Sequence, residues 1–251
     1  MNRLQPITVL CALGGALMGA QTLPKAETIL ERYVEVTGGH AAYAKHSHEK
    51  MTGTISMPEV GLTGTLTRYA IAPDKEYSVL QLGPLGKVES GFSNGVAWEK
   101  NVITGPRVKS GDERAQAARE ARFNSQAEWR KLFSSVETTG SETVNGEECY
   151  KVLATPAAGK PETQFYSKKS GLLVKTNATA VGQIGEVPVE VELSSYKSFD
   201  GVLYPTQSKS KMGPQQLNIS ITNVDFDEPV GLELFEPPAE IKALIDKGAA
   251  K

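Results

Sequence analysis

The sequence predicts an α+β fold: a large curled antiparallel sheet, or half-barrel, with helices covering one face. Apolar and polar residues alternate within 187–193 and 217–221, which is typical of strands that bury one face. The dipeptides Ser170-Gly171 and Asp200-Gly201 separate such runs and favour tight hairpins. Helical spacing is found near the N-terminus, in one internal insertion and at the C-terminus. We therefore expect helices to flank one continuous sheet.

Residues 1–20 have the pattern of a secretory signal peptide. Arg3 supplies a positive start, residues 7–20 are mostly apolar, and small residues end the run. We expect cleavage after Ala20, which leaves 21–251 as a single domain without a transmembrane segment, in the periplasm or outside the cell. The alternative, an N-terminal anchor helix, needs a longer apolar run than this one.

Composition and charge exclude several classes of protein. The chain has 251 residues, of which 39% are hydrophobic and 22% charged, so it can bury a core. Its net charge of −2 provides no basic excess for nucleic acid, and glycine-rich phosphate loops are absent. No nucleic-acid partner and no cofactor are therefore expected. Signal removal takes away Cys11 and leaves Cys149 as a single thiol, which its strand-like surroundings predict to be buried.

The mature chain begins with helical spacing over 24–45. Its apolar stripe consists of Ile29, Leu30, Tyr33 and Val34. Gly38-Gly39 favours a helix stop, because glycine readily adopts the conformation that ends a helix. A short second helix is expected over 40–45.

In two parts of the chain, apolar residues recur at every second position, which predicts strands joined by short turns. The first group lies at 51–57, 62–71, 75–82, 87–93 and 96–100. The second lies at 136–144, 147–155, 162–167 and 171–177. Together with the alternating runs described first, they predict about ten strands, and open sheets of that size tend to curl. Residues 176–186 are expected to form a loop.

Helices are expected between the two groups of strands and after the last one. Two S-x-x-E capping boxes, at 110–113 and 125–128, each mark a helix start. They predict a polar helix over 112–122 and an amphipathic one over 126–135. Residues 227–251 return to helical spacing. The insertion and this terminal helix are the elements expected to cover the apolar face of the sheet.

Two motifs suggest catalysis, and each has a more ordinary interpretation. Residues 91–95 match the G-x-S-x-G elbow of serine hydrolases, but strand-like sequence follows where the elbow requires a helix. His40, His46 and His48 lie close together in the sequence, as metal ligands can. The zinc motif H-x-x-E-H is incomplete, because Lys50 stands in place of its last histidine. No catalytic residue and no metal site are therefore predicted.

Several short motifs recur in a definite order along nearly the whole mature chain. They are 26–30 (A-E-x-I-L) with 37–39 (T-G-G), 64–66 (G-T-L), 72–75 (A-P-D-K), 91–98 (G-F-x-x-G-x-x-W), 166–173 (Y-S-x-x-x-G-L-L), 196–205 (Y-x-x-x-D-G-V-x-x-P) and 235–238 (F-E-P-P). Their order and spacing resemble the LolA-like family of exported proteins, which includes the periplasmic lipoprotein carrier. At one position the sequence departs from that carrier, which has an arginine where Ala72 stands, so the carrier's own release cycle does not follow from the resemblance.

The resemblance implies an incomplete β-barrel closed by helices, with a hydrophobic cavity that binds acyl chains. It implies an exported, non-enzymatic protein whose partners are lipid or lipoprotein acyl chains, with a role such as outer-membrane lipoprotein sorting. The candidate lining residues come from the insertion helix and the apolar strand faces. They are Trp129, Phe133, Phe165, Val191, Leu193, Ile219 and Ile221.

Two alternatives to a lipid-binding protein stay open from the sequence. If the core is filled, the chain is an envelope sensing module or a protein-interaction module that meets other envelope proteins. A metal-dependent hydrolase that uses His40, His46 and His48 is the second alternative.

Overall fold

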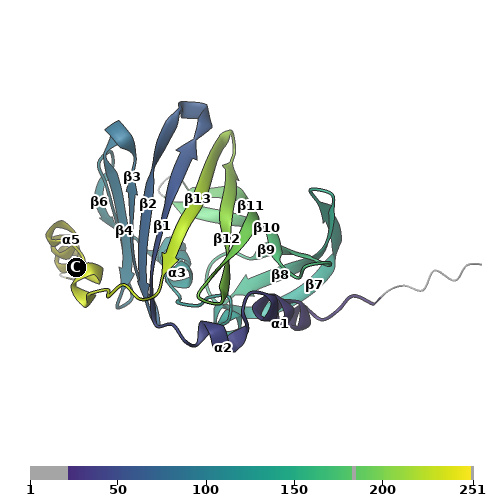
Figure 1. Ribbon diagram of the computed structural model, residues 1–251. Coiled ribbons are helices and arrows are strands. Elements are labelled where there is room, and N and C mark those ends of the chain that lie inside the picture. Colours follow the sequence, from purple (N-terminus) through teal and green to yellow (C-terminus); the bar gives the residue numbers. More distant parts are fainter. Residues whose placement is uncertain (1–21, 183–184, 250–251) are drawn as a thin grey trace, which may run out of the picture.

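The computed structural model describes residues 22–182 and 185–249. The expected signal peptide, 1–20, and Cys11 lie outside the described residues. All thirteen strands of the described chain form one antiparallel sheet, whose two ends, β6 and β7, do not meet (Figure 1). The predicted α+β half-barrel is therefore confirmed, with three strands more than the sequence indicated.

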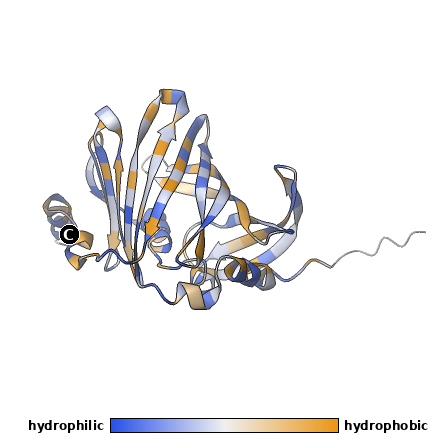
Figure 2. Cartoon of the chain, in the orientation of Figure 1, coloured by the Kyte–Doolittle hydropathy of each residue, from blue (hydrophilic) through white to orange (hydrophobic). Residues whose placement is uncertain are grey.

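The sheet consists of two meanders that meet in its centre. The order is β6-β5-β4-β3-β2-β1-β13-β12-β11-β10-β9-β8-β7, so that β1 pairs with β13 between the two halves. The strands are β1 His48–Met57, β2 Leu62–Ile71, β3 Lys75–Gln81, β4 Lys87–Ser93, β5 Val96–Asn101, β6 Gly105–Val108, β7 Phe133–Val144, β8 Glu147–Pro156, β9 Glu162–Ser167, β10 Leu173–Gly182, β11 Gly185–Phe199, β12 Val202–Met212 and β13 Gln215–Asp225. Hydrophilic and hydrophobic residues alternate along many of them (Figure 2).

Helices lie at both ends of the chain and between the two meanders. They are α1 Ala26–Val36, α2 Gly39–Tyr43, α3 Gly111–Glu120, α4 Trp129–Leu132 and α5 Ala239–Ala249, with 3-10 turns η1 Pro58–Val60, η2 Gly83–Leu85 and η3 Leu232–Phe235. The helix α1 buries Ile29, Leu30 and Tyr33 in the main core, together with Val152 and Tyr166 of the sheet. The N-terminal helices therefore close one end of the curled sheet, as Figure 1 shows.

The helix α3 covers the inner face of the first meander with very little apolar surface. Its small residues Ala117, Ala118 and Ala121 pack against Phe92 and Ala97. Polar bonds supply the other attachments, since Glu113 of α3 binds Arg107 of β6 and the Gln116 side chain accepts a bond from the Val181 backbone. The Ser110 side chain makes no capping bond, so the expected capping box is replaced by the pair between Glu113 and Arg107.

The C-terminal segment runs over the outer face of the sheet, whereas the sequence predicted that it would cover the apolar inner face. Met51 packs against the main core on the inner face, so its neighbour Lys50 points to the outer face. There Lys50 pairs with Glu228 of the C-terminal segment at 2.7 Å. Lys100 lies on the same outer face and pairs with Glu240 of α5 at 2.8 Å.

Two local predictions were wrong, and strand pairing explains both. Only Trp129–Leu132 of the expected helix 126–135 is helical, because Phe133 begins β7 and pairs with Pro156 of β8. The expected loop 176–186 is mostly strand, since β10 extends to Gly182 along β11. In each case the ladder formed with a distant partner overrides the local pattern.

Candidate functional site

The main cavity lies between the helices and the second meander and has a volume of about 460 Å³. Its walls come from α1, α3, the segment 125–133 and strands β9 to β12. The lining residues are Leu30, Tyr33, Gln116, Arg119, Glu120, Ser125, Gln126, Trp129, Leu132, Phe133, Lys160, Glu162, Gln164, Tyr166, Leu173, Ala178, Thr179, Ala180, Val189, Val191, Leu193 and Pro205.

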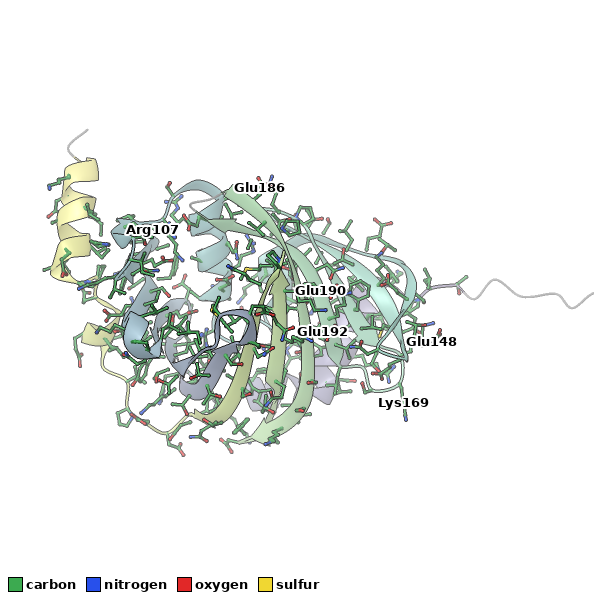
Figure 3. All side chains as sticks on the ribbon, turned by 90° about the horizontal axis from the view of Figure 1, so that it is seen from above. Arg107, Glu148, Lys169, Glu186, Glu190 and Glu192 are labelled. Atoms are coloured by element: carbon green, nitrogen blue, oxygen red, sulfur yellow. The ribbon has the colours of Figure 1, made fainter. Side chains whose placement is uncertain are left out.

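The sheet provides an apolar wall because every second residue of β11 points inward. Val189, Val191 and Leu193 lie on this wall, whereas Glu190 and Glu192 alternate with them on the outer face (Figure 3). The neighbouring strand presents Ala178 opposite Val189 and Ala180 opposite Val187. These short side chains leave space where longer ones would fill the cavity.

Aromatic side chains form the wall on the helical side. Trp129 is 6% exposed, and its indole N–H donates to the Oε1 atom of Glu31 on α1 at 2.9 Å. Tyr33 of α1 packs edge-on against Tyr166 of β9, with ring centroids 5.5 Å apart. The bond between Trp129 and Glu31 thus fixes the 125–133 segment to α1 and holds the cavity wall in place.

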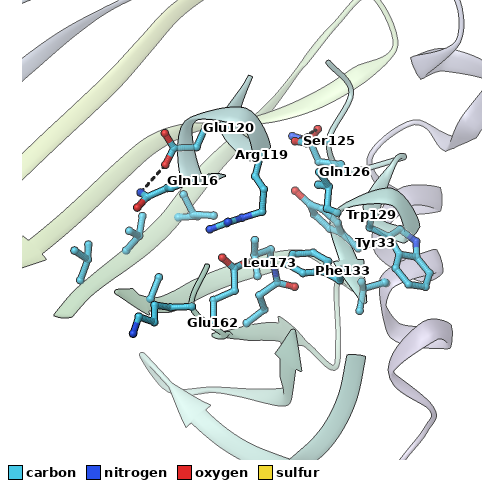
Figure 4. A pocket seen from close by; sticks show the side chains of 18 of the residues that line it. Tyr33, Gln116, Arg119, Glu120, Ser125, Gln126, Trp129, Phe133, Glu162 and Leu173 are labelled. Carbon is cyan, nitrogen blue, oxygen red and sulfur yellow. Dashed lines mark hydrogen bonds between the residues drawn. The ribbon is translucent and has the colours of Figure 1, made fainter. Parts of the chain in front are cut away.

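Polar side chains gather at the other end of the cavity. Arg119 reaches from α3 across the space toward Glu162, away from Tyr33 and Trp129 (Figure 4). Its Nη1 atom donates to the backbone oxygen of Ala158 at 2.6 Å, which orders the β8–β9 connection. Together with Lys160, Arg119 gives this end of the cavity two cationic groups.

Burial changes the titration of the two carboxyl groups at this end. It raises the pKa of Glu162, although a hydrogen bond from Gln164 acts in the opposite direction. It likewise raises the pKa of Glu120, which accepts a bond from Gln116 at 2.8 Å. Both carboxyl groups receive side-chain amide donors, which stabilise the charged form less than a close cation would.

The structure places four of the seven predicted lining residues in this cavity: Trp129, Phe133, Val191 and Leu193. Phe165 is buried on the outer face, in a small cluster with Val144 and Cys149. Ile219 and Ile221 lie on β13 and are not among the residues that line the cavity, although Ile221 packs against the main core.

Several lining residues were not predicted as such, although the sequence contains a signal for some of them. Leu30 and Tyr33 belong to the apolar stripe of the N-terminal helix, and one face of that stripe had to meet the sheet. Tyr166 directly follows Phe165, so one of the two had to face inward. The position of Arg119 had no such signal, because α3 is polar on most sides.

The three histidines have three different environments. The Nε2 atom of His40 lies 3.0 Å from a Glu31 carboxylate oxygen. The ring of His46 stacks on Phe226 with centroids 3.8 Å apart, while His48 lies on β1. Within the described ranges, no three His, Cys, Asp or Glu side chains are arranged to hold a metal ion. The geometry therefore gives no support to the hydrolase alternative.

The G-x-S-x-G motif forms a hairpin between β4 and β5. Asn94 and Gly95 have positive φ angles of 52° and 77°, and a strand follows them. Ser93 is 4% exposed and accepts a hydrogen bond from Lys75 at 3.0 Å. Gly91 lies under the Trp98 indole, where an added Cβ would come within 2.7 Å of the ring nitrogen. The motif has a packing role, because its serine is buried and its first glycine makes room for an aromatic ring.

No protein-family model and no curated protein matches this sequence. Solved structures do match the fold. A LolA superfamily protein from Nitrosomonas europaea superposes with a TM-score of 0.58 at 10% identity, over 86% of this chain and 99% of that one. The chain has a LolA-like fold.

Two further solved structures match over nearly as much of the chain. A DUF1329 family protein from Desulfovibrio piger gives a TM-score of 0.56 at 15% identity, over 84% of this chain and 97% of that chain. A Vibrio parahaemolyticus domain described as an outer membrane lipoprotein-sorting protein gives 0.55 at 12% identity, with coverages of 84% and 97%. Each of these similarities covers 84–86% of this chain, so the likeness extends over most of the fold.

At the Ala72-Pro73 turn, this LolA-like chain uses backbone atoms to bind the insertion. The Phe123 N–H donates to the Pro73 oxygen at 3.0 Å, which ties the β2–β3 turn to the segment after α3. The alanine side chain itself donates and accepts no hydrogen bond. Among the described helices, none is long and apolar enough to cross a membrane.

Proposed function

We propose that this chain is an exported, non-enzymatic protein that binds the acyl chain of a lipid or lipoprotein in the main cavity. In this proposal residues 1–20 are a removed signal peptide, and 21–251 act as one domain in the periplasm or outside the cell. The LolA-like fold and the lipoprotein-sorting description of one similar domain support a role in outer-membrane lipoprotein sorting. No cofactor is required.

The main support for this proposal is that the cavity has an apolar wall and a polar end. The wall of Val189, Val191, Leu193 and aromatic rings suits a hydrocarbon chain, and the end with Arg119 and Lys160 suits a polar head group. The volume of about 460 Å³ lies within the range of about 300–1,000 Å³ that is usual for ligand sites. Burial of a chain of ~14 carbons gives roughly 11 kcal/mol at about 0.8 kcal/mol per CH₂. Ordering of the chain and loss of its free motion reduce this value.

Native mass spectrometry and fatty-acid uptake test the proposal. Protein purified from its own envelope is expected to carry a lipid mass, and the emptied protein is expected to take up a fluorescent fatty acid. In Ala178→Trp the new side chain enters the cavity, so we expect uptake to fall at least about tenfold, or about 1.4 kcal/mol.

A neighbouring residue provides the matched control. Asn177 is exposed and alternates with Ala178 on the same strand, so Asn177→Trp points to the other face and should leave uptake unchanged. Absence of both a bound lipid and fatty-acid uptake in the wild-type protein would refute the proposal. The interaction module with a filled core would then be the better explanation.

A further inference from the structure

Exposed apolar side chains gather on two adjacent hairpin tips that contribute no residue to the cavity wall. The β3–β4 tip comprises 82–86 and the β5–β6 tip comprises 101–105. Leu85 is 45% exposed, Val102 is 62% exposed and Ile103 is 75% exposed. Single exposed apolar residues are common, but a group of them on a protruding edge marks an interaction surface.

Strand pairing brings the two tips to the same edge of the sheet. Strands β3, β4, β5 and β6 pair in sequence as antiparallel neighbours, so both turns lie at one end of the meander. A Cβ added to Gly86 would lie 3.2 Å from a methyl group of Val102, which shows that the tips touch. We call Leu85, Val102 and Ile103 the tip patch. The β1–β2 hairpin, whose tip carries the 68% exposed Val60, rises at the same edge (Figure 1).

Hydrogen bonds within the tips satisfy several of their backbone groups. The Leu85 N–H donates to the Leu82 oxygen at 3.0 Å, and the Leu82 N–H donates to the Gly86 oxygen at 2.8 Å. The Ile103 N–H donates to the side-chain oxygen of Asn101 at 2.8 Å. In hydrocarbon an unsatisfied polar group costs several kcal/mol, so these bonds make the tips suited to a medium without water.

The charge pattern also favours a lipid surface. Residues 82–86 and 101–105 contain no charged side chain. Lys87 directly follows the first tip and pairs with Glu89 at 3.1 Å. Its side chain is 51% exposed, so it can leave this weak surface pair and meet anionic head groups. A patch of three protruding side chains is small for a specific protein interface, which usually buries about 1,200–2,000 Å².

We propose that the tip patch inserts into the surface of a lipid bilayer and holds the protein there reversibly. This inference goes beyond the ligand of the cavity, because the tip patch contains none of the residues that line it. Leu85, Val102 and Ile103 enter the boundary between head groups and acyl chains, while Lys87 remains at the level of the head groups.

Vesicle flotation tests this proposal with matched variants. Wild-type protein is mixed with vesicles of phosphatidylethanolamine and phosphatidylglycerol, and the bound fraction is measured. The triple variant Leu85→Ser, Val102→Ser, Ile103→Ser is expected to bind at least about tenfold more weakly. The control variant Leu232→Ser, Leu244→Ser removes exposed apolar residues of the C-terminal segment and should bind as the wild type does.

A second measurement locates the contact. In Ile103→Trp, the fluorescence of the new tryptophan should shift to the blue on vesicle binding and be quenched by brominated acyl chains. The native Trp98 and Trp129 are 1% and 6% exposed, so their emission should change little. Wild-type protein that does not float with these vesicles, or a triple variant that floats equally well, would overturn the proposal. Fatty-acid uptake by the triple variant should stay at the wild-type level, which separates this test from that of the cavity.

Discussion

Arg68 is the residue whose replacement we expect to destabilise the sheet most, because it pairs with two carboxylates on the inner face. Its Nη1 atom donates to Glu49, and its Nη2 atom donates to Glu76 at 3.1 Å. The Glu49 side chain is 5% exposed and the Glu76 side chain 19% exposed, so neither can turn freely to water. The Tyr204 hydroxyl also donates to Glu49, at 2.8 Å.

The expected effect of Arg68→Met follows from the charge that is left behind. Removal of one member of a buried ion pair costs about 3–5 kcal/mol, because the remaining charge has lost its partner. A domain of this kind has about 5–15 kcal/mol of stability in total, so the variant should fold but unfold at much lower urea concentration. Urea unfolding followed by tryptophan fluorescence measures the change in the free energy of unfolding.

A double-mutant cycle checks the assignment to Glu49. The variant Glu49→Gln removes the carboxylate and keeps an acceptor for the Tyr204 hydroxyl. We expect the combination with Arg68→Met to cost less than the sum of the single changes, by about 0.5–3 kcal/mol. Arg114 is exposed on α3, and Arg114→Met should change stability by no more than about 0.5 kcal/mol. The reasoning fails if Arg68→Met is as stable as the control, or if the two changes are additive.

Three further outcomes are expected. Burial raises the pKa of Glu162, so its contribution to the free energy of unfolding is fully present below the pKa of the unfolded state and is lost as the pH rises through the folded-state pKa. At neutral pH the buried carboxylate is therefore unfavourable, and Glu162→Gln should stabilise the protein. Unfolding curves measured in acid should show no such gain. Gly91→Ala should cost about 1–3 kcal/mol in urea unfolding, because the new Cβ meets the Trp98 ring, whereas Gly182→Ala, which meets nothing within 4 Å, should be nearly neutral; equal costs would contradict this. Burial raises the pKa of the fully buried Cys149 thiol, so a thiol reagent should label it only after unfolding, and rapid labelling of native protein would show that the outer-face cluster opens.

Alternation along the chain predicted the sheet well, because a strand with one buried face leaves a period of two in its own sequence. The ranges expected for β2, β4 and β9 agree with the structure. Only Trp129–Leu132 of the helix expected over 126–135 is helical, because the residues from Phe133 onward join a ladder with β8. Pairing with a partner far along the chain leaves no mark in the local sequence.

The candidate site was predictable in part for the same reason. Val191 and Leu193 share a face by their spacing alone, so both were expected to lie on one wall. Phe165 and Tyr166 show the limit: alternation says that they face opposite ways but does not say which of them faces inward. The position of Arg119 required the path of α3 across the cavity, which depends on polar contacts with Ala158 and Val181 rather than on an apolar pattern.

The pairing of β1 with β13 has a consequence for how the chain acquires its structure. Each meander consists of neighbouring hairpins and can form from local contacts. The centre of the sheet, however, forms only when β1 pairs with β13, which brings Lys50 opposite Asp225. Contacts between such distant residues form slowly, since a long loop must close first. Until then β1 and β13 each present an unpaired edge, which is the kind of surface that recruits other chains. The step that unites the two halves is therefore also the period in which a newly made chain most needs protection from self-association.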